Sequence, residues 1–253
     1  MEVHHHSHTA RQKWKHYVWE FLMLFFAVTA GFFVENQREH FIEHQRAKQY
    51  AKALLSDLTS DTAILSNNIS TLREVISAQE KTLELMKTDR PDTLPGGALY
   101  NYADISGGGT FFTVKTSTLQ QLKNSGSLRY FKDFELVQLI NEYDQALTNQ
   151  FLRLDVDQNF SVEYREAYNQ LFDFKKQELI NDHMFNFPEK RDSIFQLKLP
   201  LLSYDKQLIS NYLHALENRK YNLVRRIEKY YSEPLDAAKK LIVALKETYH
   251  LRD

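Results

Sequence analysis

The sequence predicts an all-α protein: an N-terminal transmembrane helix continuous with an elongated antiparallel bundle of three long helices plus short helices. Three observations predict this fold class. Residues 17–34, YVWEFLMLFFAVTAGFFV, are apolar except for Glu20 and the hydroxyl groups of Tyr17 and Thr29. Residues 32–90 contain neither glycine nor proline, which is typical of continuous helix. The remaining chain repeats apolar residues at helical spacing.

The apolar segment 17–34 has the length of a membrane span. As a helix it rises about 27 Å, close to the hydrocarbon thickness of a bilayer. Aromatic residues that favour the membrane interface flank its start: Trp14, Tyr17 and Trp19. Basic residues precede it: Arg11, Lys13 and Lys15. This basic bias predicts a cytoplasmic N-terminus.

The predicted organisation is therefore a His-rich basic cytoplasmic N-terminus (1–16), a transmembrane helix (17–34) and an extracytoplasmic helical bundle (35–253) with a Gly/Pro loop at 89–116. This organisation predicts a single-pass protein of a bacterial inner membrane whose C-terminal domain is periplasmic. The alternative is a cleaved secretory signal, because Val28-Thr29-Ala30 resembles a small-residue cleavage site. The apolar run continues through Val34, which favours a retained anchor.

The first long helix is expected to pack through a coiled-coil-like seam. Its apolar positions recur every three or four residues: Ala47, Ala51, Leu54, Leu58, Leu65, Ile69, Leu72, Ile76, Leu83 and Met86. Thr62 and Gln79 occupy the two polar places in this seam. A break capped by Ser60 and Asp61 is the alternative to one unbroken helix.

The later elements follow from caps and breakers. We expect a short helix at 117–124 closed by Gly126, a second long helix from Asp133 to about His183, and a third from Asp205. Pro188 and Pro200 bracket a connection whose centre, 194–202, alternates like a short extended piece. Ser232 is expected to cap a restart of the third helix before Pro234.

Helix lengths then predict the directions of the chain. The first long helix leads away from the bilayer, the second returns and the third leads away again. The Gly/Pro loop would lie at the far end, and the Pro188–Pro200 connection near the bilayer.

Composition excludes several classes of site and partner. The chain has no cysteine, so disulfides and thiolate metal sites are absent. Its formal net charge is −1, which gives no basic field for nucleic acid. We expect no cofactor; the expected partners are the lipid bilayer and either further copies of the chain or another membrane protein.

Three sequence segments suggest a family. They are the opening MEVHHHSH, the stretch WKHYVWEFLMLFFAVTAGFFVENQREH with the following QYAKALLSDLTSDT, and LQQLKNSGSL at 119–128. Together they resemble a group of uncharacterised single-pass membrane proteins abundant in Bacteroidetes-type bacteria. The resemblance implies that MEVHHHSH is native sequence and that the anchor is retained in the inner membrane. It implies no activity.

Histidine clusters are the candidate metal sites. A cluster at the N-terminus is able to bind Zn, Ni or Cu as any polyhistidine does: His4, His5, His6 and His8. A second pattern, His40, Glu43 and His44, matches the H-x-x-E-H order of one class of zinc peptidases. A solvated or packing face of the helix is the alternative interpretation of this pattern.

Charged residues supply the other candidates. Glu20 lies inside the apolar segment, where an acid is a functional candidate by default, and Lys13, Lys15 or His16 is expected to pair with it. Asp57 and Asp61 are one turn apart and are expected to be exposed. Basic residues near the C-terminus are expected on the surface, in helical salt bridges with Glu217 and Glu228: Arg219, Lys220, Arg225, Arg226 and Lys229.

No catalytic constellation emerges, so the leading hypothesis is a non-enzymatic structural or adaptor protein that acts by protein–protein contact or self-association. One alternative is a transmembrane sensor or ion-coupled subunit that uses Glu20 and the N-terminal histidine cluster. The other is a membrane zinc metallopeptidase built on His40, Glu43 and His44.

Overall fold

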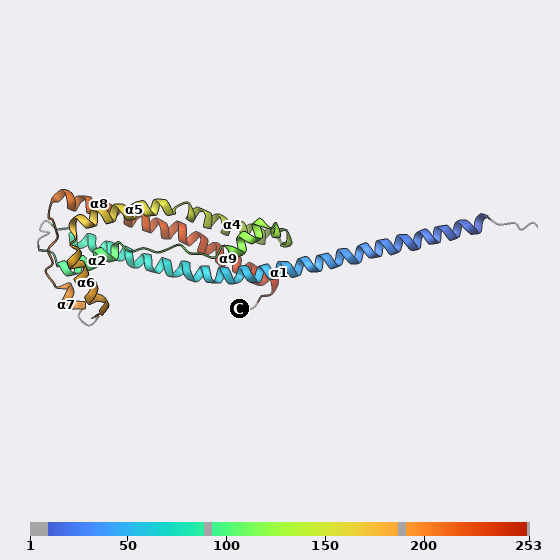
Figure 1. The fold of residues 1–253 in the computed structure, drawn as a ribbon, viewed down its shortest axis with the longest axis horizontal. Coiled ribbons are helices and arrows are strands. Elements are labelled where there is room, and N and C mark those ends of the chain that lie inside the picture. Colours follow the sequence, from blue (N-terminus) through green and yellow to red (C-terminus); the bar gives the residue numbers. More distant parts are fainter. Residues whose placement is uncertain (1–9, 89–92, 187–190, 252–253) are drawn as a thin grey trace, which may run out of the picture.

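The computed structural model describes residues 10–88, 93–186 and 191–251. Every regular element in these ranges is helical, which confirms the predicted all-α bundle. Figure 1 shows a rod-like bundle from which one helix, α1 (Ala10–Met86), projects far beyond the other elements. The end of α9 (Ser232–Tyr249) lies beside α1, near the place where that helix leaves the bundle.

Helix α1 is unbroken over its 77 residues, so it is about 115 Å long. The alternative of a break at Ser60 and Asp61 is wrong, because both lie within the helix. Burial on α1 begins at Ala47 and continues along the predicted seam, where Leu54, Leu58 and Leu65 are at most 1% exposed. The part of α1 before residue 42 extends outside the bundle.

The remaining helices follow α1 along the chain. They are α2 (Gly96–Ser106), α3 (Ser117–Asn124), the 3-10 turn η2 (Ser127–Tyr130), α4 (Phe134–Phe151), α5 (Leu154–Leu171), α6 (Phe174–Asn186), α7 (Arg191–Phe195), α8 (Lys206–Arg225), the π-helical η4 (Arg226–Tyr231) and α9 (Ser232–Tyr249).

The predicted directions of the long helices are wrong for the second and third. The core cluster near the projecting part of α1 unites Ala51 with residues of α4 and of the end of α9. The cluster at the far end unites Met86 with residues of α5 and of the start of α8. Helices α4 and α5 therefore run in the same direction as α1, and α8 to α9 run back against both (Figure 1).

Residues 107–116 are extended and lead the chain back along α1 toward its projecting part, as the second long helix was expected to do. We call this stretch the return segment. Ser106, just before it, contacts Gln79, and Lys115 near its end contacts Asp61. Eighteen residues of α1 rise about 27 Å between these contacts, and an extended chain covers about the same distance in nine residues.

The predicted Gly/Pro loop at 89–116 is only partly irregular, because α2 forms inside it. Helix α2 packs against the connection that follows α6, where the Gly97 N–H donates to the Leu197 carbonyl over 2.9 Å. A Cβ on Gly97 would overlap the Ile194 carbonyl, so only glycine allows this approach. The connection thus lies at the far end, and its expected position near the bilayer is wrong; Pro188 itself lies outside the described residues.

Local start and stop signals are largely confirmed. The Asp133 carboxylate accepts hydrogen bonds from the Glu135 and Leu136 N–H groups, and Asp205 caps α8 in the same way. Gly126 is left-handed, with φ 67°, after α3. The second long helix, however, is divided at 152–153 and at 172–173. The expected extended piece at 194–202 begins as the end of α7.

The predicted restart at Ser232 is also wrong, since η4 leads into α9 without interruption. The Ser232 hydroxyl donates to the Ile227 carbonyl over 2.8 Å instead of capping α9. In a regular α-helix the ring of Pro234 would clash with the carbonyl four residues earlier. We attribute the wider π-helical turn just before Pro234 to this conflict.

Candidate functional site

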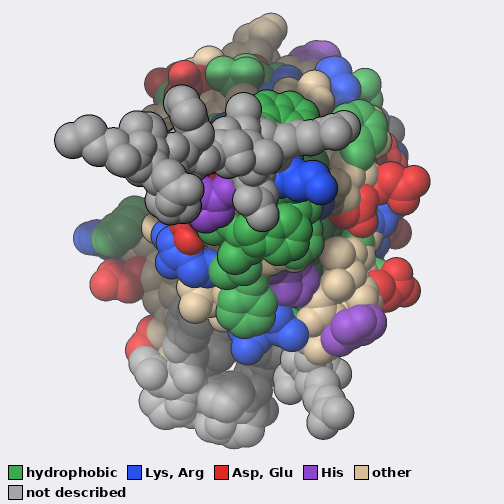
Figure 2. All heavy atoms as spheres, turned by 90° about the vertical axis from the view of Figure 1, so that its right-hand side faces the viewer, with side chains coloured by type: hydrophobic (Ala, Val, Ile, Leu, Met, Phe, Trp, Pro, Cys, Tyr) green, Lys and Arg blue, Asp and Glu red, His purple; other side chains and the backbone are tan. Residues whose placement is uncertain are grey.

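The apolar segment of α1 is entirely outside the bundle. It is the one stretch in the described ranges that is long and apolar enough to cross a membrane, and none of it is buried. Large apolar side chains are exposed along it, among them Phe21, Phe26 and Phe32. Figure 2 shows the molecule from the end where α1 projects, with hydrophobic side chains gathered at the centre of the view. This surface is available to lipid or to another helix.

Glu20 pairs with His16, one of its three expected partners. The His16 Nε2 and Glu20 Oε1 atoms are 3.0 Å apart across one helical turn, and both side chains are more than half exposed. The pair lies at the N-terminal end of the apolar segment, on the projecting part of α1. Glu20 is thus paired at the place where a membrane–water boundary would fall.

The predicted metal ligands do not form a site in the described residues. His4, His5, His6 and His8 lie outside those residues. Around His40 and His44, as throughout the described ranges, no three His, Cys, Asp or Glu side chains group to hold a metal ion.

The H-x-x-E-H residues instead contact the bundle where α1 enters it. Glu43 is 2.9 Å from the Lys132 ammonium, whose hydrogen bond lowers the pKa of Glu43. The His44 ring packs against Tyr249, with ring centroids 5.9 Å apart. Lys132 lies just before α4, and Tyr249 ends α9. These two contacts therefore join α1 to the end of the bundle nearest its projecting part.

Asp61 forms a buried junction between three segments, contrary to the prediction that it is exposed. Its Oδ2 accepts from the Tyr143 hydroxyl of α4 at 2.7 Å, and its Oδ1 accepts from the backbone N–H of Lys115 at 2.8 Å. The residue is fully buried. Burial raises the pKa of Asp61, and the two hydrogen bonds oppose that rise. Burial beside Asp61 raises the pKa of Tyr143 as well.

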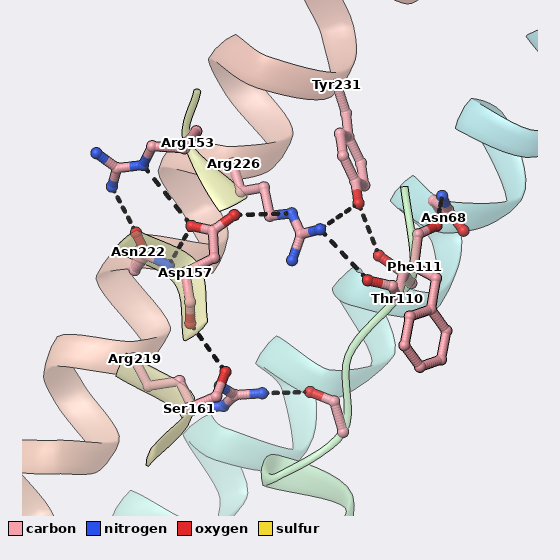
Figure 3. A network of polar contacts seen from close by, with 11 residues as sticks. Asn68, Thr110, Phe111, Arg153, Asp157, Ser161, Arg219, Asn222, Arg226 and Tyr231 are labelled. Atoms are coloured by element: carbon pink, nitrogen blue, oxygen red, sulfur yellow. Dashed lines mark hydrogen bonds and ion pairs between the residues drawn. The ribbon is translucent and has the colours of Figure 1, made fainter. Parts of the chain in front are cut away.

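A second polar network lies farther from the projecting helix, between α5 and α8–η4 (Figure 3). Asp157 is its acid. Asn222 donates to Asp157 over 2.9 Å, and the Arg226 Nε lies 3.3 Å from the same carboxylate. Arg153 approaches Asp157 at 3.7 Å and donates to Asn222 over 2.6 Å.

Two arginines of this network hold the start of the return segment. Arg219 donates to the carbonyls of Gly107 and Gly108 at 3.0 and 2.6 Å, and also to the Ser161 hydroxyl. Arg226 donates to the Thr110 carbonyl at 3.3 Å. Burial lowers the pKa of Arg219. The predicted surface salt bridges are therefore wrong for these two residues, which are at most 7% exposed.

Four of the buried polar side chains share one task, which is to satisfy the backbone of the return segment. An extended chain without a neighbouring strand has no regular partners for its N–H and C=O groups. Asn68 donates to the Phe111 carbonyl over 3.0 Å. Asp61 accepts from the N–H of Lys115. Arg219 donates to the carbonyls of Gly107 and Gly108, and Arg226 donates to that of Thr110. This arrangement positions a segment; it presents no nucleophile paired with a base.

Sequence reasoning missed Asp61, Arg219 and Arg226 as interior residues. The position of Asp61 was visible in the sequence, because residues 54, 58, 61 and 65 keep the spacing of one buried helix face. The predicted seam has Thr62 in this polar place instead. Arg219 and Arg226 are seven residues apart, two turns on one face of a helix. Their acceptors are mostly backbone carbonyls, which leave no mark in a sequence.

No family model, curated protein or solved structure matches the chain. Function is therefore inferred from the sequence pattern and from the geometry of the described residues. That geometry consists of a projecting apolar helix and a bundle stabilised by internal polar junctions.

Replacing Asp157 by Asn is expected to lower the free energy of unfolding by about 3 kcal/mol, because it removes the acid that faces buried arginines. Denaturant unfolding of the solubilised full chain, followed by circular dichroism, measures the change. The matched control is E163Q, at an exposed acid of the same helix, which should change it by less than about 0.5 kcal/mol. Equal effects of the two substitutions would contradict the assigned role of Asp157.

The raised pKa of Asp61 gives stability a pH dependence. Above the ordinary Asp pKa the unfolded chain loses the proton while the folded chain retains it, so the contribution of Asp61 falls as pH rises. The free energy of unfolding of the wild type minus that of D61N should therefore decrease from about pH 4 to about pH 7.

Urea unfolding of both proteins at the two pH values measures this difference. The control compares the wild type with D155N, at an exposed residue of α5. A difference that rises with pH, or that changes equally for D155N, would contradict the account of Asp61.

Proposed function

We propose that the protein is a non-enzymatic, single-pass membrane protein that acts by protein–protein contact, as a structural or adaptor component. One observation carries the proposal. The exposed apolar segment and the buried seam belong to one unbroken helix, α1. A membrane span that continues into the core of a bundle holds that bundle at a set distance and orientation.

The dimensions suit a domain held away from a bilayer. If the apolar segment ends at Val34, the first buried residue, Ala47, lies about 20 Å beyond it along the helix. Met86 lies about 80 Å beyond it. Contact surfaces on the bundle would then be presented well outside the lipid headgroups.

The proposed compartment is the periplasm, with the anchor in a bacterial inner membrane. Basic residues before the apolar segment support a cytoplasmic N-terminus, since Lys and Arg favour the cytoplasmic side. After the segment, Glu35 pairs with Arg38, with the Glu35 Oε2 2.9 Å from the Arg38 Nε, so the positive charge of Arg38 is offset. The resemblance of residues 1–62 to single-pass membrane proteins supports the same placement.

Self-association through the anchor is part of the proposal. Small residues Ala27, Ala30 and Gly31 lie on one side of the span and allow a second helix to approach closely. Nothing in the described structure lies within 4 Å of a Cβ placed on Gly31. Thr29 lies on a different face of the same helix.

Cysteine crosslinking tests this contact, and the native chain has no cysteine to interfere. Oxidation of membranes that contain G31C should produce a disulfide-linked dimer. The matched variant T29C should produce at least about fivefold less, because its sulfur faces away from the small-residue side. Gel electrophoresis without reductant measures the dimer.

Failure of both variants to crosslink, together with a detergent-extracted mass of one chain and no co-purifying protein, would contradict the proposed function.

A further inference from the structure

A basic groove runs along α1 at the end of the bundle nearest the projecting helix. Its volume is about 940 Å³. The face of α1 from Lys48 to Ala63 forms one wall, and Lys115 of the return segment and the end of α9 at His250 complete it. Figure 1 shows the end of α9 beside α1 in this region.

The groove has one sign of charge. Four lysines line it, Lys48, Lys52, Lys115 and Lys246, together with His250, and no acidic residue is among the described residues that line it. No ion pair joins Lys48, Lys52 or Lys115 to any of the described residues. The chain as a whole has a net charge of −1, so this concentration of positive charge is local. A groove of this kind attracts an anionic partner.

Its other lining groups suit a polypeptide. Leu55 and Leu251 give the groove an apolar surface, and the hydroxyl groups of Ser56 and Ser60 supply hydrogen-bonding capacity. The wall from Lys48 to Ala63 is about 22 Å long, which matches six or seven extended residues or four turns of helix. Lys115 lies beside Asp61, about 13 Å along α1 from Lys52, so several separate anionic groups are required to meet the lysines.

Two other polyanionic surfaces fit less well. Lys48 is fourteen residues beyond Val34, about 21 Å along the helix, whereas headgroups extend only about 6 Å from the hydrocarbon. The bilayer that would hold α1 therefore does not reach the groove. Single-stranded nucleic acid binds through stacking on aromatic side chains, and His250 supplies the only ring among the lining residues that the structure describes.

We propose that this groove is the docking site for an acidic segment of a partner protein. The inference rests on the proposed adaptor function and names the charge and length of the segment that it would bind. Carboxylates of the segment pair with Lys48, Lys52 and Lys115, and its apolar side chains contact Leu55 and Leu251.

The test uses the full chain in lipid nanodiscs and a fluorescein-labelled peptide of twelve alternating Glu and Ala residues. Fluorescence anisotropy at low salt measures its Kd. The wild type should bind this peptide at least about tenfold more tightly than K52E/K115E does, because both charges are reversed at exposed positions. K52Q/K115Q should be intermediate.

The matched control is K87E/K206E, which makes the same change in net charge at two exposed lysines of the far end. Its Kd should stay within about twofold of the wild-type value. Circular dichroism of each variant verifies folding; the Lys115 backbone N–H that contacts Asp61 is retained in all of them.

Equal loss in the two reversed variants, absence of peptide binding to the wild type, or tighter binding of a twelve-residue oligothymidylate would overturn the proposal. Crosslinking of G31C in the same nanodiscs separates this inference from the proposed function. Loss of peptide binding with intact crosslinking overturns the groove alone, whereas peptide binding by a chain that neither crosslinks nor retains a partner contradicts the proposed function and leaves the acidic-peptide site of the groove standing.

Discussion

The uninterrupted backbone hydrogen bonding of α1 is the constraint on which the rest of the structure depends. A helix satisfies its own N–H and C=O groups, so the same element is able to pass through lipid, water and a protein core. Its sequence changes character along the way, from the apolar residues before Val34 to the one-sided seam that begins at Ala47. Every other long helix packs on that seam or on a neighbour that does.

The return segment is the second constraint, because it allows α1 and α4–α5 to run in the same direction. Its extended backbone has no neighbouring strand, and the bundle supplies side chains in place of one. Asp61 binds it near one end, Arg219 and Arg226 bind it near the other, and Asn68 binds it between them. The cost of burying these charged groups is offset by hydrogen bonds that the segment would otherwise lack.

Local signals in the sequence predicted much of the fold. The length of α1 followed from the absence of helix breakers, and the starts of α4 and α8 followed from Asp133 and Asp205. The directions of the later helices could not be predicted in the same way. The ten extended residues of the return segment cover the distance of about twice as many helical residues, so counting helix lengths placed α4–α5 in the wrong direction. Likewise, arginines spaced like Arg219 and Arg226 indicate a solvated helix face. Only the structure shows the backbone carbonyls to which they donate.

The proposed function requires α1 to be rigid between the apolar segment and the bundle. Double electron–electron resonance between spin labels at T29C and Q49C, on the full chain in nanodiscs, measures this rigidity directly. An unbroken helix predicts one narrow distance distribution near 30 Å. A broad distribution, or one centred well below that distance, would show a hinge before Ala47 and would contradict the account.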